Sequence, residues 1–244
     1  TRELISALET ELAEHGPELP SFWGNRFWTP HLVDAVRAMR DAGVKRALAI
    51  ATSALGSYSG CRVYLDDLAR AREAVEGAPA IDKIPPFWDE PGYLETCVER
   101  LLEVLPAGGA TVLFSAHSIP AAMARACGYA EQLETLAARV AEAAGVSEHQ
   151  VVYQSRSGPP QVPWLEPDIL DALAQVPAGS TVVVAPIGFV ADHMEMVWDL
   201  DEEARVRAEG LGPRFVRMRR DLIARALCQG VAGCPPDCCP MRRA

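Results

Sequence analysis

The chain has 244 residues, of which 49% are hydrophobic, and its formal net charge is −10 at pH 7; that length and composition allow one large domain or two small ones with cores of their own. The negative charge disfavours nucleic acid and acidic membrane surfaces as partners and suits a cation better. No apolar run approaches the roughly 20 residues that span a bilayer and no signal peptide pattern opens the sequence, so we expect a cytoplasmic protein without a membrane span.

Strands and helices are predicted to alternate along the chain. The predicted strands are β-branched or aliphatic runs, and the predicted helices have apolar residues at helical spacing. In chain order we expect a helix at 30–43, a strand at 44–53, helices at 62–76 and 93–105, a strand at 110–118, a long helical stretch ending near 144, a strand at 149–158, a helix at 168–176, a strand at 180–190, a helix at 192–210, a strand at 214–218 and a helix at 220–230. The proline-rich segment 78–92 is expected to be irregular.

This alternation predicts an α/β fold with parallel sheets flanked by helices on both faces. Glycines and a proline interrupt the pattern in "PAGGA" at 106–110, which favours a boundary between two subdomains there. We therefore expect a first α/β subdomain at 1–107, a second at 108–226 and a cysteine-rich tail at 227–244.

Polar sequence follows three of the predicted strands, in "TSALGSYSG", "SAHSIP" and "PIGFVADHMEM". Ligands of parallel sheets bind beyond the carboxyl ends of the strands, where these segments lie. An imidazole with an ordinary pKa of about 6.5 can accept a proton or bind a metal. His117 alone is equally compatible with a hydrogen-bonded core histidine, or with a helix start capped by Ser115 and Ser118. His193 and Glu195, after another strand, favour a functional site.

An acidic helix is predicted to start at this site. Glu195, Asp199 and Glu203 are spaced by four residues, so that their carboxylates share one helical face. A solvated face is the ordinary explanation of such a pattern. Because the row begins beside His193, we favour a path for a divalent cation, which oxygen ligands bind without trapping.

Aromatic residues gather in two other segments. Trp164 lies in the proline-braced loop "SGPPQVPWLEP", and "SFWGNRFWTP" surrounds Arg26 with four aromatic side chains. Packing is their default role. The alternative is that they wall a flat aromatic ligand, with Arg26 pairing an anionic substituent.

Four of the seven cysteines crowd the end of the chain: Cys228, Cys234, Cys238 and Cys239. In a cytosolic chain a metal or iron–sulfur site explains such a group better than disulfides do.

Several segments together resemble the ferrochelatases, which insert ferrous iron into a porphyrin. These are "GNRFWTPHLVDAV", "SAHSIP", "QSRSGPPQVPWLEPD" and "PIGFVADHMEMVWDLDEE", in the family's order and over nearly the whole chain. The resemblance implies a chelatase-like fold of two Rossmann-like subdomains. It also implies an incomplete first subdomain, because the sequence starts at Thr1 without the family's N-terminal quarter. Phe27 stands where some relatives have tyrosine.

The resemblance further implies roles for single residues. His117 is the expected catalytic base and Glu195 its acidic partner, since a porphyrin must lose two N–H protons as the metal enters. The same two residues, with Asp199 and Glu203, are expected to handle the metal. The expected porphyrin contacts are Arg26, Ser57, Tyr58, Ser59, Trp164 and His193.

Some members of the family carry a 2Fe–2S cluster on one internal cysteine and three near the C-terminus. By that resemblance we expect Cys97, Cys228, Cys234 and Cys239 as ligands, with Cys238 as the nearest substitute, because adjacent Cys238 and Cys239 cannot both bind a small cluster without strain. A zinc site on the same cysteines is the alternative.

The expected substrates are ferrous iron and coproporphyrin III, which would give coproheme in haem biosynthesis. The serine and tyrosine hydroxyls of "SYSG" suit propionate groups, of which coproporphyrin has four. Protoporphyrin IX, another tetrapyrrole with cobalt or nickel, and a non-catalytic haem-binding or iron–sulfur protein are the alternatives. We expect a monomer or a weak dimer.

Overall fold

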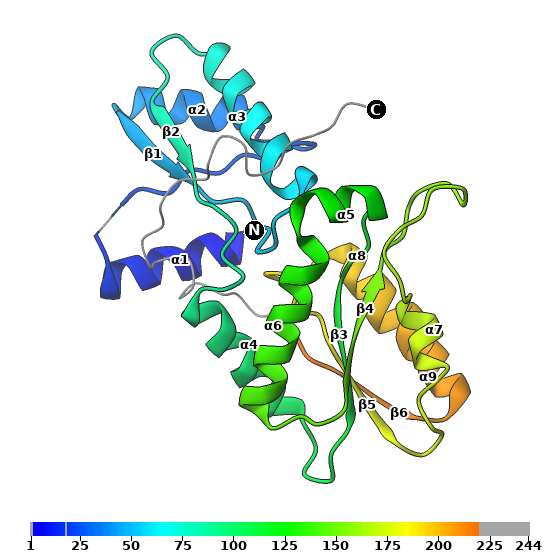
Figure 1. The fold of residues 1–244 in the computed structure, drawn as a ribbon. Helices are drawn as coiled ribbons and strands as arrows, with labels where there is room; N and C mark the ends of the chain where they lie inside the picture. Colours follow the sequence, from blue (N-terminus) through cyan, green and yellow to red (C-terminus); the bar gives the residue numbers. More distant parts are fainter. Residues whose placement is uncertain (1, 18, 220–244) are drawn as a thin grey trace.

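The computed structural model describes residues 2–17 and 19–219, which form two parallel sheets (Figure 1). The smaller sheet pairs β1 (Arg46–Ala49) with β2 (Ala80–Lys83). The larger has the order β4-β3-β5-β6, with β3 (Thr111–His117), β4 (His149–Gln154), β5 (Thr181–Ala185) and β6 (Arg214–Arg217). The predicted α/β class with parallel, helix-flanked sheets is thereby confirmed. Within the described part of the chain, none of the helices has both the length and the apolar character needed to cross a bilayer.

Helices α2 (Leu32–Asp41) and α3 (Val63–Glu73) accompany the smaller sheet, and a single turn of π-helix, η1 (Tyr58–Arg62), leads into α3. Val36, Ala71 and Val75 form their small shared core. Two elements here differ from the predictions. No element was predicted for α1 (Arg2–His15), and the segment expected to be irregular contains β2. The sequence of β2 is short and has no buried apolar face, so β2 is defined by its backbone pairing with β1 rather than by periodicity.

Both faces of the larger sheet are covered by helices. Helices α4 (Pro91–Val104), α5 (Ala121–Cys127) and α6 (Tyr129–Ala144) belong to one side, and α7 (Ile169–Leu173), α8 (Met194–Met196), π-helix η2 (Val197–Ala204) and α9 (Arg205–Leu211) to the other (Figure 1). Successive residues of β3 point to opposite faces, so Phe114 joins the core under α4 and α6 whereas Leu113 joins the core under α7 and η2.

Two predicted helices are divided. The long stretch after β3 breaks at Gly128, whose φ of +65° is left-handed and suits a residue without a side chain. The predicted acidic helix contains the π-helical segment η2, and helical periodicity in the sequence does not distinguish the two forms. Helix α4, in the segment assigned to residues 1–107, packs against α6 in the core of the larger sheet. The predicted helix at 220–230 lies outside the described residues.

Candidate functional site at the carboxyl ends of the larger sheet

His117 is the last residue of β3 and therefore lies at the edge of the larger sheet where the parallel strands end. Five residues of β3 are buried, and the pairing of His117 with Gln154 makes β3 end level with β4. Ser118 N donates to Gln154 O at 2.7 Å, and the Tyr129 hydroxyl donates to His117 O at 3.0 Å. The backbone that carries the imidazole is therefore fixed from two sides.

The turn after β5 crosses over the end of β3. Gly188 N donates to Ser115 O at 3.0 Å. A Cβ on Gly188 would lie 2.3 Å from Ala116 Cβ, so the approach needs a residue without a side chain. This contact brings the start of α8, with His193 and Glu195, to His117.

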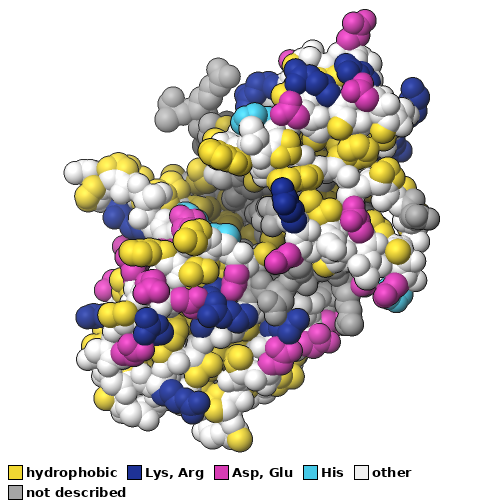
Figure 2. Space-filling model, turned by 180° about the vertical axis from the view of Figure 1, so that it is seen from behind, with side chains coloured by type: hydrophobic (Ala, Val, Ile, Leu, Met, Phe, Trp, Pro, Cys, Tyr) yellow, Lys and Arg dark blue, Asp and Glu magenta, His cyan; other side chains and the backbone are white. Residues whose placement is uncertain are grey.

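The structure brings His117 and Glu195 together, with Nε2 and Oε1 3.7 Å apart. His117 Nδ1 lies 2.5 Å from Ser118 O, which can only accept, so we assign the proton to Nδ1 and a lone pair to Nε2. The two side chains are 34% and 51% exposed. Figure 2 shows histidines and carboxylates beside a hollow between the two parts of the molecule. A base and a carboxylate that face each other across 3.7 Å can share a metal ion or pass a proton.

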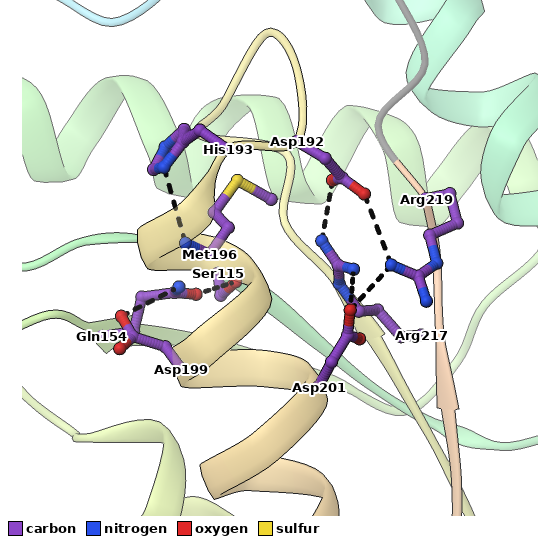
Figure 3. A network of polar contacts seen from close by, with 9 residues as sticks. All are labelled: Ser115, Gln154, Asp192, His193, Met196, Asp199, Asp201, Arg217 and Arg219. Atoms are coloured by element: carbon purple, nitrogen blue, oxygen red, sulfur yellow. Dashed lines mark hydrogen bonds and ion pairs between the residues drawn. The ribbon is translucent and has the colours of Figure 1, made fainter.

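His193 caps the short helix that carries Glu195: its Nδ1 accepts from Met196 N at 3.4 Å (Figure 3). Its ring packs edge-on against Phe189, with the centroids 5.4 Å apart. Partial burial lowers the pKa of His193, an effect that Glu195 opposes and His117 reinforces. His193 is therefore held neutral, as an accepting cap requires.

The three acids predicted to form a row have different surroundings. Asp199 accepts from Gln154 Nε2 at 3.4 Å and from the Ser155 hydroxyl. Glu203 accepts from Trp198 Nε1 at 3.2 Å, on the exposed side of the helix. Within residues 2–17 and 19–219, no group of three or more histidine, cysteine or acidic side chains is close enough to hold a metal ion. The row is thus a series of separate carboxylates.

Asp168 is a further carboxylate beside this row that the sequence analysis did not single out. It caps α7 by accepting from Leu170 N at 2.8 Å. Burial raises the pKa of Asp168, the neighbouring carboxylates, including Asp199 and Glu203, raise it further, and the cap hydrogen bond opposes them. Its position directly after Pro167 and before an apolar helical run was the available signal.

The "SYSG" loop forms the start of η1 and lies beside α5. Ser57 is buried, and its hydroxyl accepts from Gly60 N at 2.8 Å as the cap of η1. Tyr58 is half-buried, and Ser59 is exposed with its hydroxyl 3.9 Å from Met123 Sδ. The hydroxyl of Ser59 is thus accessible, whereas the hydroxyl oxygen of Ser57 already accepts one hydrogen bond and keeps its proton to donate.

Arg26 lies in the segment before α2 and is already paired. Its Nε donates to Asp67 Oδ2 at 2.5 Å, and its guanidinium lies over the rings of Phe27 and Tyr64 at 4.8 and 5.2 Å. A substrate carboxylate would have to compete with Asp67 for this cation.

Close contacts within its loop and with Pro120 hold Trp164 in place. A Cβ on Gly158 would lie 2.2 Å from its indole nitrogen, and the backbone of Trp164 bridges to Pro120. The indole N–H is buried, with no hydrogen-bond partner among the described residues. The loop is therefore a rigid wall beside the end of β3.

Of the predicted cluster ligands, the structure describes Cys97, which is fully buried in α4. Cys228, Cys234, Cys238 and Cys239 lie outside the described residues.

Comparison with known proteins gives a consistent result. The family model described as ferrochelatase matches residues 1–221. A ferrochelatase of Rhodopirellula baltica is 41% identical in an alignment that covers 98% of this chain and 77% of the relative. A coproporphyrin III ferrochelatase of Mycobacteroides abscessus is 46% identical in an alignment that covers 91% of this chain and 71% of the relative. The fold resembles that of the sirohydrochlorin chelatase SirB from Bacillus subtilis subspecies spizizenii, solved with cobalt, with a TM-score of 0.66 at 13% identity over 92% of this chain and 84% of that chain.

Proposed function

The chain belongs to the ferrochelatase family, and we propose that it inserts ferrous iron into coproporphyrin III to give coproheme. The assignment to a lyase that places iron in a porphyrin rests on the family. The choice of coproporphyrin III is supported by relatives of that name at 45–46% identity. The net charge of −10 suits a divalent metal substrate and requires local cations for an anionic porphyrin.

The 3.7 Å approach of His117 Nε2 to Glu195 Oε1 carries the mechanistic proposal. A porphyrin bound over this pair must release two N–H protons, and the lone pair on Nε2 can accept one. Glu195 can hold the incoming ion or take the proton onward. Asp199 and Glu203, further along the helix, are suited to guide hydrated iron towards this pair, because carboxylates bind such ions without fully removing their water.

We assign substrate contacts to Arg26, Ser57, Tyr58, Ser59, Trp164 and His193. Arg26 would bind a propionate by exchanging Asp67 for it, and Ser59 and Tyr58 would approach from the loop between the subdomains. Trp164, held rigid by Gly158, would form a wall against the macrocycle. His193 would contribute through its ring edge, because its Nδ1 is occupied by the cap.

The decisive experiment is His117→Ala, followed by the absorption change as porphyrin becomes metalloporphyrin under anaerobic conditions. We expect insertion to fall by at least about a hundredfold, the scale of losing a general base, while the affinity for coproporphyrin III is retained. His15→Ala is the matched control, since that ring is on the exposed side of α1. A non-catalytic carrier would lose little with either change. Parallel assays with protoporphyrin IX, cobalt and zinc rank the alternative substrates.

We also infer a 2Fe–2S cluster on Cys97, Cys228, Cys234 and Cys239, with Cys238 as the substitute. Thiolates are the donors that such clusters need, and Cys97 is the ligand that lies in the described part of the chain. Cys97→Ser should abolish the visible absorption of the purified protein together with its bound iron and sulfide. A colourless wild-type protein that contains zinc would establish the zinc alternative instead.

The subdomain limits of 1–107, 108–226 and 227–244 remain part of the proposal, as do a cytoplasmic location and a monomeric or weakly dimeric state. Sedimentation of the protein over a range of concentrations tests the state of assembly.

A further inference from the structure

A buried arginine joins three elements next to the candidate site. Arg217, on β6, is 3% exposed; its Nη1 donates to Asp201 Oδ2 at 2.8 Å and its Nη2 donates to Asp192 Oδ1 at 2.7 Å (Figure 3). Its Nε has no hydrogen-bond partner among the described residues. The guanidinium of Arg217 thus donates to two carboxylates.

The two carboxylates lie on different segments of the site. Asp192 directly precedes His193 and is three residues from Glu195, in the turn that follows β5. Asp201 is on the π-helix η2, two residues after Asp199. Arg217 therefore fixes the turn that carries Glu195 against both the acidic helix and the edge strand.

Arg219 contacts the same two carboxylates from the solvent side. Its Nη1 is 2.7 Å from Asp201 and 3.6 Å from Asp192, but the side chain is 58% exposed. Exposed pairs are screened by water and hold geometry poorly, whereas a guanidinium buried between two carboxylates has little freedom. Of the two arginines, Arg217 is the one that sets position.

The acidic residues of this region fall into two groups, according to whether they pair with an arginine. Asp192 and Asp201 are neutralised by arginine, and Arg205 pairs with Glu202 and Glu209. The described ion pairs include no lysine or arginine partner for Glu195, Asp199 or Glu203. Among the described residues, the row therefore keeps its negative charge, whereas Asp192 and Asp201 do not.

We propose that Arg217 is a positioning residue of the insertion reaction: it holds the turn of Glu195 at its distance from His117 and keeps Asp192 and Asp201 out of the metal path. This role rests on the proposed function, the insertion of iron into a porphyrin. The net stability of a buried ion pair is small, because desolvation offsets attraction, so its main effect here is to select one arrangement of the turn and helix.

The test compares Arg217→Met with Arg205→Gln, which removes an arginine of the same helical region whose side chain is 42% exposed. A compensated variant, Arg217→Met with Asp192→Asn and Asp201→Asn, removes the two carboxylates that Arg217→Met leaves paired with the exposed Arg219 alone. All are assayed for the KM for ferrous iron, kcat, and affinity for coproporphyrin III. Thermal unfolding shows whether each variant is folded.

We expect the compensated variant to be folded, to bind coproporphyrin III within about twofold of wild type, and to show a KM for iron raised, or a kcat lowered, by at least about tenfold. Arg205→Gln should match wild type. Wild-type KM and kcat in the folded compensated variant would overturn the proposal, as would an equal loss in Arg205→Gln. Loss confined to Arg217→Met, and restored by compensation, would also overturn it, because the position of Glu195 would then not depend on Arg217.

Hydrogen exchange separates this inference from the proposed function, because it needs no turnover. Faster exchange at residues 188–196 in the compensated variant, with β3 unchanged, supports positioning even in a protein that inserts no iron. If wild type inserts no iron, the proposed function fails, whereas unchanged exchange at 188–196 in the variant overturns the positioning role.

Discussion

Gly188→Ala should separate the two halves of the candidate site. The new Cβ would lie 2.3 Å from Ala116 Cβ and 2.8 Å from Ala116 Cα. Carbon atoms in contact are normally about 3.5 Å apart, so the turn must retreat from β3 by about 1 Å. Because Glu195 follows on the same segment, the 3.7 Å separation from His117 should widen by a similar amount. A 1 Å misplacement can cost about a hundredfold in rate, and overpacking costs about 1–3 kcal/mol of stability.

The assay for Gly188→Ala is the initial rate of coproheme formation, with thermal unfolding measured alongside. Gly210→Ala is the matched control, because a Cβ there meets nothing within 4 Å and the residue lies in α9. The same chemical change should stabilise the control by up to about 1 kcal/mol and leave the rate unchanged, since alanine favours helix more than glycine does. A folded Gly188→Ala protein with the wild-type rate would refute the claim that this close approach sets the geometry of the site.

Two further predictions concern carboxylates. Asp67→Asn should release Arg26 and raise the affinity for coproporphyrin III by about two- to fivefold, which is the scale of a partly exposed ion pair. The affinity is measured by fluorescence titration. Equal or weaker binding would show that Arg26 does not bind a propionate. Asp168→Asn should stabilise the protein at pH 7 by about 0.5 kcal/mol, because it removes a carboxylate close to Asp199 and Glu203 while asparagine keeps the helix cap. The pKa of Asp168 is raised, so wild type recovers this stability as the pH falls through that pKa. The unfolding curves of the two proteins should therefore differ at pH 7 and converge once the pH is below the ordinary pKa of an aspartate, about 3.9.

The two inner strands of the larger sheet, β3 and β5, were predictable because they are buried on both faces and read as almost continuous apolar runs. The run from Thr111 to Phe114 is an example, and the structure places it at the centre of the sheet. The smaller sheet was only half predictable, since the four residues of β2 carry two charges and gain their structure from β1. The break at Gly128 depends on a left-handed φ, which helical periodicity does not report.

The approach of His117 to Glu195 followed from topology, because the ends of parallel strands share one edge of the sheet. Topology does not predict the contacts that distinguish otherwise similar acidic residues. Asp192 and Asp201 differ from Glu195 in their ion pairs with Arg217 and Arg219, which lie on or just after a strand later in the sequence. The pairing of Arg26 with Asp67 likewise joins residues 41 positions apart, and no local pattern predicts it.

The hydrogen bond from His117 Nδ1 to the Ser118 carbonyl has a consequence for the order of events. With that nitrogen committed, the ring offers the substrate a single electron pair, which a proton and a ferrous ion cannot occupy together. Protonation also makes the ring cationic and repels the metal. A proton and a ferrous ion should therefore compete for Nε2. In each turnover, whichever of the two is bound must leave Nε2 before the other can bind.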